Sequence, residues 1–280
     1  MKKILVFIFI FTSIFVLSSC KGSNRKIYET YEYGEYPQSK VYDSKIITEL
    51  DKFTSADVNE DGYFILNGKK YLKAYAELDS DSSRFADDSK IVKGNYYYFQ
   101  VSPIRWRVLN KNNNEMQLIT ESVLISSNYT NAVDSLDYSS SLVRSFLITD
   151  FYNRAFKYTT TKPLTKNIVI TTIDDKKISE INDSIWIPTT TELQSQDNGF
   201  YSSDDRYAFV TDYAKAMGIN YCKEGATSYF NNAANFITST LSLDSKSIFY
   251  CDFYGDYKMT SDLSSLTKIG VRPRIDLKIQ

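Results

Sequence analysis

The 280-residue chain contains no histidine, and it has only three cysteines, five prolines and ten glycines. The absence of histidine excludes a Ser-His-Asp or Cys-His nucleophile pair, a histidine general base and a histidine-ligated metal. The 33 basic and 34 acidic residues nearly balance, which argues against a nucleic-acid partner, because attraction to phosphates needs an excess of cations. Hydrophobic residues make up 42% of the chain, enough for a folded core.

The N-terminus has the pattern of an export signal. Two lysines at positions 2 and 3 precede an apolar segment, residues 4–17, which is shorter than the roughly 20 residues that span a bilayer as a helix. The segment ends in Leu17-Ser18-Ser19-Cys20, which resembles a bacterial lipobox. We favour a lipoprotein over an ordinary signal peptide with an incidental cysteine. Residues 1–19 are then the signal peptide, and Cys20 carries acyl chains such as palmitate.

Lipidation would place the protein in the cell envelope, anchored to a membrane on the export side. Residues 20–32 read as the lipidated cysteine and a polar tether. In a cell with two membranes, Lys21 favours the outer one, because it replaces the aspartate that retains many lipoproteins at the inner membrane. The two remaining cysteines, Cys222 and Cys251, would meet an oxidising compartment, so we favour a disulfide over two buried thiols.

Residues 33–280 read as one domain, because no Pro-rich or Gly/Ser-rich linker divides them. Residues 33–95 form an N-terminal extension with a hairpin, and residues 96–280 form the core. Apolar periodicity predicts helices over 41–53, 139–156 and 204–217 and strands over 31–36, 63–66, 69–78, 104–108, 116–125, 248–253 and 271–279. This mixture predicts an α+β fold with largely antiparallel pairing. The residues expected in its core are Ile104, Trp106, Val108, Phe146, Phe151, Trp186 and Val271.

Several segments, taken in order, resemble DUF6273, a domain of unknown function found in bacterial surface proteins and lipoproteins. They are GEYPQ (34–38), NGKKY (67–71), PIRWRVL (103–109), SLVRSFL (141–147), IWIP (185–188), TDYAKA (211–216) and GVRP (270–273). The resemblance extends distantly to formylglycine-generating enzymes and C-type-lectin-like folds, and it implies a C-type-lectin-like domain. Residues 236–240 depart from the family, since they read FITST where its members usually have Trp-Leu-Arg-Ser.

Catalysis has little support from these residues. A formylglycine-type oxidase would need a close pair of copper-binding cysteines, and the remaining cysteines lie 29 positions apart in the chain. Carboxylates such as Asp174, Asp175, Asp204, Asp205 and Glu192 could form a hydrolase pair, but nothing in the sequence selects two of them. We therefore assign no catalytic residue and no cofactor.

Two clusters are candidate ligand contacts. Asp57, Asn59 and Asp61, followed by Gly62, match the first half of an EF-hand calcium loop. The twelfth position, which should be a bidentate glutamate, is Gly68, so a hairpin turn is favoured.

Arg272 and Arg274 alternate along the last predicted strand and could clamp an anion, although a solvated strand face is favoured. Tyrosine is abundant, at 23 residues, and is densest at 96–98, 250, 254 and 257. Its flat ring and hydroxyl make it a good contact residue for sugars and proteins.

Together these features predict a membrane-anchored surface lipoprotein that acts as a binding module for a glycan, a cell-wall component or a surface protein. One alternative is an envelope hydrolase that uses a carboxylate pair, and another is a structural envelope protein without a small ligand.

Overall fold

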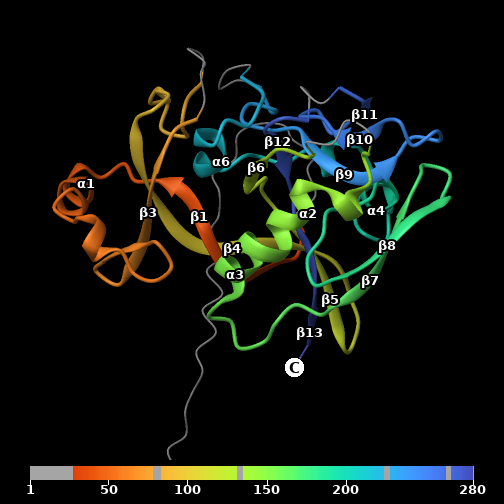
Figure 1. Ribbon diagram of the computed structural model, residues 1–280, viewed down its shortest axis with the longest axis horizontal. Coiled ribbons are helices and arrows are strands. Elements are labelled where there is room, and N and C mark those ends of the chain that lie inside the picture. The colour runs from red at the N-terminus through yellow and green to blue at the C-terminus, as the bar shows by residue number, and fades with distance from the viewer. Residues whose placement is uncertain (1–27, 78–82, 131–134, 224–227, 263–265, 280) are drawn as a thin grey trace, which may run out of the picture.

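The computed structural model describes residues 28–77, 83–130, 135–223, 228–262 and 266–279 (Figure 1). Its first sheet has six strands, of which five follow the order β13-β5-β4-β3-β2, and β1 also pairs with β4. Strand β4 pairs with β3 in its first half and with β5 in its second half, while β1 runs antiparallel to it. These strands are β1 (Thr30–Lys40), β2 (Phe64–Leu66), β3 (Lys69–Tyr75), β4 (Tyr96–Lys111), β5 (Glu115–Thr120) and β13 (Arg274–Lys278).

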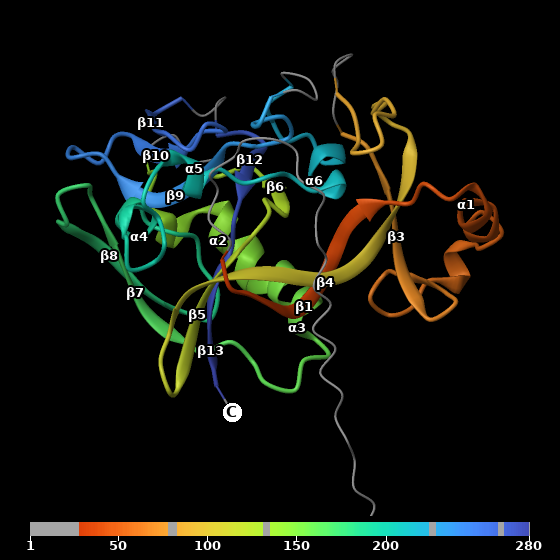
Figure 2. The same ribbon diagram turned by 180° about the vertical axis from the view of Figure 1, so that it is seen from behind.

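The second sheet has five strands in the order β11-β10-β9-β12-β6, and its pairing is antiparallel except between β12 and β9. A separate antiparallel hairpin, β7–β8, projects at one side in Figures 1 and 2. The strands are β6 (Ile125–Ser127), β7 (Lys166–Thr171), β8 (Lys177–Asp183), β9 (Phe236–Leu241), β10 (Ile248–Cys251), β11 (Tyr257–Thr260) and β12 (Ile269–Val271).

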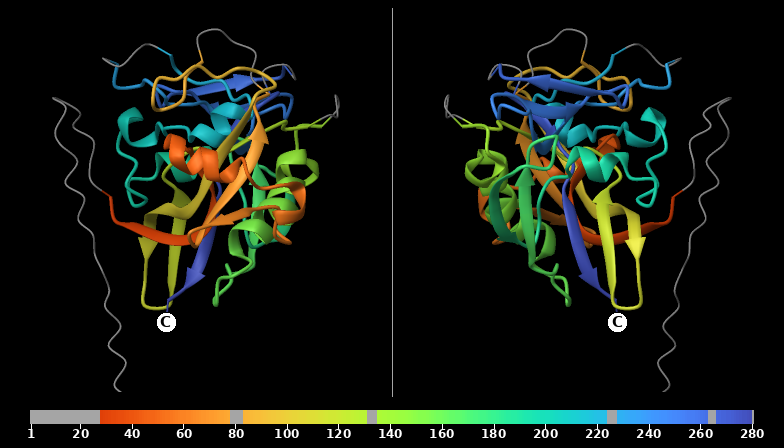
Figure 3. Two further views of the ribbon diagram at one scale, coloured as in Figure 1. Left: turned by 90° about the vertical axis from the view of Figure 1, so that its left-hand side faces the viewer. Right: turned by 90° about the vertical axis from the view of Figure 1, so that its right-hand side faces the viewer.

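The helices are short, and most begin at a side-chain cap. The segment expected as one amphipathic helix is α2, a π turn and α3 in succession, and it begins where the Ser141 hydroxyl accepts a hydrogen bond from the Arg144 amide at 3.1 Å. Figure 3 shows this segment on the opposite side of the long strands from the short helices of the 190–216 region. The helices are α1 (Ser44–Leu50), α2 (Leu142–Phe146), α3 (Tyr152–Phe156), α4 (Thr190–Gln194), α5 (Ser203–Arg206) and α6 (Asp212–Ala216), with 3₁₀ turns at Ser55–Asp57 and Tyr138–Ser140 and the π turn at Leu147–Phe151.

The largest hydrophobic cluster lies between the two sheets and the α2–α3 segment. Trp106 is fully buried there, and its indole Nε1 donates to the Tyr33 carbonyl at 2.7 Å. Of the residues expected in the core, Val108 and Phe146 are only partly buried, and the others are buried: Ile104, Trp106, Phe151, Trp186 and Val271.

The N-terminal extension forms a lobe made of α1, β2, β3 and the start of β4, which lies at one side of the molecule in Figures 1 and 2. The lobe has a small apolar cluster of its own, built around Leu50, Phe64, Tyr71 and Tyr98. Strand β1 begins at Thr30, inside the segment expected as the tether, so the folded part starts before residue 33.

Two expected elements are corrected. The predicted helix 204–217 is two short helices, because Phe209 pairs with Ala233 as a β-bridge and the Thr211 hydroxyl caps a new helix by accepting from the Ala214 amide. The predicted strand 271–279 is interrupted at Pro273: β12 ends before it in one sheet, and β13 begins after it in the other. Proline has no amide hydrogen for a ladder, which suits this crossing between sheets.

Candidate functional site: a tyrosine-lined groove

A surface groove of about 600 Å³ lies where the start of β1 meets the turn after α3 and the end of β13. We call this feature the groove. It is lined by residues 29, 31–34, 111, 116, 158–161 and 277–279.

One wall of the groove is a stack of aromatic rings. Residues two apart on a strand face the same side, and Tyr31 and Tyr33 stack with ring centroids 6.4 Å apart. Tyr33 stacks in turn on Phe156 at 5.3 Å, and Phe156 stacks on Trp106 at 6.2 Å. Tyr31 remains 43% exposed. The core tryptophan therefore supports an exposed tyrosine face through two further rings.

The turn after α3 forms the opposite wall. The Tyr33 hydroxyl donates to the Thr159 hydroxyl at 3.1 Å and to the Thr161 carbonyl, which ties the turn to β1. Tyr158 is 57% exposed, and its hydroxyl donates to the Asp61 carboxylate. We call Tyr31, Tyr33 and Tyr158 the groove tyrosines.

The charges of the groove cancel. Glu29 forms an ion pair with Lys111 at 3.4 Å. Glu32 and Lys278 are exposed, and neither side chain has an ion pair or hydrogen bond within the described part of the chain. The lining thus contains two carboxylates and two ammonium groups, together with threonine hydroxyls and apolar side chains. This set can stack on a sugar ring and exchange hydrogen bonds with its hydroxyls without attracting an ion of either sign.

Two of the groove tyrosines, Tyr33 and Tyr158, stay protonated at neutral pH. Burial raises the pKa of Tyr33 above its ordinary value. The hydrogen bond to Asp61 raises the pKa of Tyr158, because the neighbouring carboxylate disfavours a phenolate. Both hydroxyls are therefore hydrogen-bonding groups and not nucleophiles or bases.

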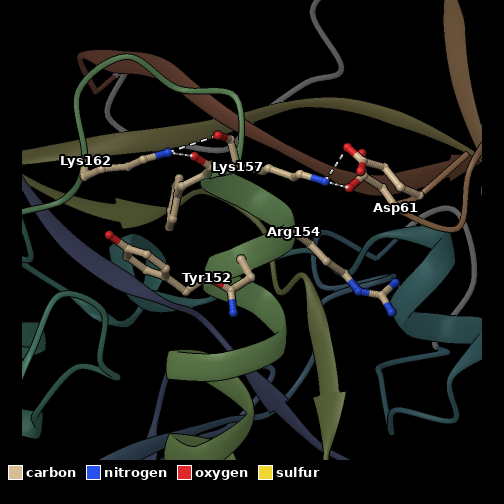
Figure 4. A pocket seen from close by; sticks show the side chains of 8 residues that line it. Asp61, Tyr152, Arg154, Lys157 and Lys162 are labelled. Atoms are coloured by element: carbon tan, nitrogen blue, oxygen red, sulfur yellow. Dashed lines mark hydrogen bonds and ion pairs between the residues drawn. The ribbon is translucent and has the colours of Figure 1, made fainter.

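A neighbouring pocket of about 570 Å³ joins the N-terminal lobe to the end of α3 (Figure 4). Lys157 bridges Glu60 at 2.8 Å and Asp61 at 2.5 Å, and Arg154 pairs with Asp150 at 3.0 Å. Lys162 donates to the backbone carbonyls that end the helix. Because each cation already has a partner, this pocket is a junction between lobe and core rather than an anion site.

The arginines expected on a solvated strand face are buried, and that expectation was wrong. Arg272 donates from Nε to the Thr120 carbonyl at 2.8 Å. Arg274 lies with its guanidinium over Trp186 and pairs with Glu192. The end of the chain crosses between the sheets, so both faces of this segment are covered. Neither arginine lines the groove, and their side chains make the contacts of an internal framework.

The oxygens of the half calcium loop are used locally. The Asp57 carboxylate accepts from the Thr54 amide at 2.7 Å and caps a 3₁₀ turn. The Asn59 side-chain oxygen, Oδ1, accepts from the Asp61 and Tyr63 amides. Within the described residues, no group of three or more acidic or cysteine side chains is arranged to hold a metal. This loop is a local turn that leads from the 3₁₀ turn into β2, whereas the β-hairpin itself closes at Asn67-Gly68, between β2 and β3.

Cys222 and Cys251 are both buried, and no disulfide joins them. The expected bridge is therefore replaced by two thiols. Burial raises the pKa of the Cys251 thiol to about 12, which removes its nucleophilic thiolate at neutral pH. Cys20 lies outside the described residues.

Three of the five carboxylates considered for a hydrolase have structural partners. Asp205 accepts from the Tyr201 and Ser202 amides and from the Tyr28 hydroxyl. Glu192 accepts from the Thr189 amide at 2.9 Å, and Asp174 accepts from a threonine hydroxyl. These contacts supply helix caps and turns.

The groove was not predicted from the sequence, although tyrosine contacts were. The densest tyrosine groups lie elsewhere: Tyr96 is 64% exposed and packs edge-on against Tyr75, and Tyr254 packs against Phe230. The available signal was the alternation Tyr31-Glu32-Tyr33, which places two rings on one strand face.

These observations define a sheet-rich α+β domain with antiparallel pairing and an aromatic surface groove. The family model for DUF6273, a domain of unknown function, matches residues 113–279, and the chain belongs to that family. No curated protein and no solved structure matches the chain. Among the described residues, no helix has the length and apolar character to cross a bilayer.

Proposed function

We propose that this protein is a membrane-anchored lipoprotein of the cell envelope whose domain binds a glycan in the groove. The observation that carries the proposal is the exposed face of Tyr31, supported by Tyr33 and Phe156 and flanked by the carboxylate of Glu32. An apolar ring beside hydrogen-bonding groups matches the two faces of a pyranose. The anchor would be Cys20, at the end of the lipobox-like segment.

A C-type-lectin-like architecture is part of this proposal. Its support is the Gly270-Val271-Arg272 segment, the late motif on which the resemblance rests. Gly270 is buried so tightly that an added Cβ would lie 2.2 Å from the Asn235 carbonyl oxygen. A glycine is therefore required where this strand crosses the core.

A glycan array with the soluble domain, residues 21–280, tests the proposal in calcium and in chelator. Selective binding to a sugar class in both conditions is expected, because the groove holds no acidic cluster for a cation among the described residues. A blank array in both conditions would exclude glycan binding, and crosslinking for protein partners would be the next step.

Titration of the selected sugar with variants locates the site. Tyr31→Ala should weaken binding about 2- to 12-fold, since an aromatic stacking contact contributes about 0.5–1.5 kcal/mol. Tyr96→Ala is the matched control, because Tyr96 is also an exposed strand tyrosine and lies outside the groove. Equal losses in both variants would place the site elsewhere.

A further inference from the structure

The chain is fixed to the domain at Tyr28, the first described residue. The Tyr28 ring stacks over the guanidinium of Arg107 at 3.9 Å, and its hydroxyl donates to the Gly199 carbonyl at 2.9 Å and to Asp205. An added Cβ on Gly199 would lie 2.9 Å from the Tyr28 ring, so the glycine makes room for it. Arg107 is fully buried and held by Glu121 at 2.7 Å. Tyr28 therefore attaches the start of the described chain to a buried part of the core. We call this set of contacts the Tyr28 latch.

The groove begins one residue after this latch. Glu29 lines the groove, its carbonyl accepts from the Val108 amide at 2.9 Å, and its carboxylate pairs with Lys111. From Cys20 to Tyr28 the chain makes eight residue steps, which span at most about 29 Å when fully extended. A lipid on Cys20 would therefore hold the near end of the groove within about 3 nm of the membrane surface.

We propose, as a deepening of the function proposed above and resting on it, that the groove takes an uncharged acetamido-sugar oligomer presented by the membrane that carries the anchor. The net charge of the lining is zero, which disfavours an ionic polymer. An acetamido N–H can donate to the exposed Glu32 carboxylate, and the acetyl methyl can pack on Met116 and Leu277 at the floor. Because the segment from Cys20 to Tyr28 is short, the groove reaches a glycan carried on a lipid of the same membrane and not one on a facing surface.

Binding in one membrane has an energetic advantage. When the domain and the glycan share a membrane, their association becomes effectively intramolecular, with an effective concentration set by the tether length. The Tyr28 latch keeps the tether short. Without it, the chain would be attached to the domain only from β1 onward. A groove that binds the glycan weakly then suffices for occupancy.

The test uses the mature chain coupled through Cys20 to a maleimide lipid in phosphatidylcholine vesicles. The other two cysteines are buried, so coupling is selective. The probe is a glycolipid with an N-acetylglucosamine trimer as headgroup. Energy transfer between domain and glycolipid reports binding within one vesicle, and light scattering reports clustering of domain vesicles with separate glycolipid vesicles.

The expected result is energy transfer within a vesicle and no clustering between vesicles. The control inserts 40 Gly/Ser residues after Ser23, which adds a root-mean-square reach of about 35 Å and should make clustering appear. If domain vesicles with the native tether cluster with glycolipid vesicles as strongly as those with the extended tether, the inference of a shared membrane is overturned. A soluble domain that binds other sugars of the array but not the free trimer would overturn the acetamido-sugar class. A blank array would overturn the proposed function itself.

Discussion

Removing the carboxylate of Glu192 should destabilise the domain more than removing a charged side chain at its surface. Glu192 has two structural partners: it accepts from the Thr189 amide at the start of α4, and it pairs with the guanidinium of Arg274. The Arg274 side chain is only 4% exposed. Burial lowers the pKa of Arg274 to about 10, so the side chain is still a cation at neutral pH. Truncation at position 192 therefore removes the hydrogen-bonded counter-ion of a buried charge.

The size of the loss in stability follows from that buried charge. Breaking a buried ion pair by removing one partner costs about 3–5 kcal/mol, most of it from the uncompensated ion. Asp276 remains an ion-pair partner, with its nearest oxygen 3.7 Å from the Arg274 guanidinium, so the loss should fall at the lower end of this range. For a domain of this size, about 2–4 °C of melting temperature corresponds to each kcal/mol, so a loss of about 3 kcal/mol in Glu192→Ala should lower it by about 6–12 °C.

Thermal and urea unfolding of residues 21–280 measure this effect. Glu192→Gln keeps an acceptor for the Thr189 amide, so it separates the cap from the charge. The double variant Glu192→Gln, Arg274→Met removes both ions and should recover part of the loss, with Lys166 left as the ion-pair partner of Asp276. Glu180→Ala is the control, because its pair with Lys177 is exposed and screened by solvent and so should contribute little to stability. A loss below about 1 kcal/mol in Glu192→Ala, or no recovery in the double variant, would refute the reasoning.

Three further outcomes are expected. Gly34→Ala should lower the melting temperature by several degrees more than Gly68→Ala, since both glycines have positive φ but only at Gly34 would the new Cβ meet the Ala155 carbonyl oxygen, at 2.7 Å. A thiol reagent should find two slow-reacting thiols in native residues 21–280 and two fast ones after denaturation, and a disulfide between Cys222 and Cys251 would give none in either state. Glycan affinity should stay constant from neutral pH to about pH 9, because the pKa values of two groove tyrosines are raised from an ordinary value of about 10; a fall over that range would mean that a phenolate forms in the groove.

Local patterns predicted the elements whose partners are close in the chain. The alternation through Ile104 and Trp106, followed by an asparagine-rich loop, correctly indicated the β4–β5 hairpin. The alternation fails after Trp106, where Arg107 is also buried, because the rings of Tyr28 and Phe200 lie against its guanidinium. That cover comes from distant segments, and no window of the local sequence contains it.

The groove escaped prediction for a similar physical reason. Tyrosine density along the chain identifies neighbours in sequence, and on a strand these alternate between faces, as at positions 96–98. A binding surface instead needs rings from separate elements on one face, here from the start of β1 and from the turn after α3. The hydrogen bond from Tyr33 to Thr159, across 126 positions, is the kind of contact that creates such a surface.

The groove also lies across the boundary of the family match. Residues 113–279 contain β5, β13 and the turn after α3, whereas the other four strands of the same sheet, β1 to β4, precede them. The boundary divides the β4–β5 hairpin and separates the core tryptophan, Trp106, from the Phe156 ring that it supports. The matched residues therefore supply one wall of the groove and its floor, while the preceding segment supplies the tyrosine stack and the latch at Tyr28. Ligand choice at this groove should accordingly vary with the sequence of the segment before residue 113, even among chains that share the rest of the domain.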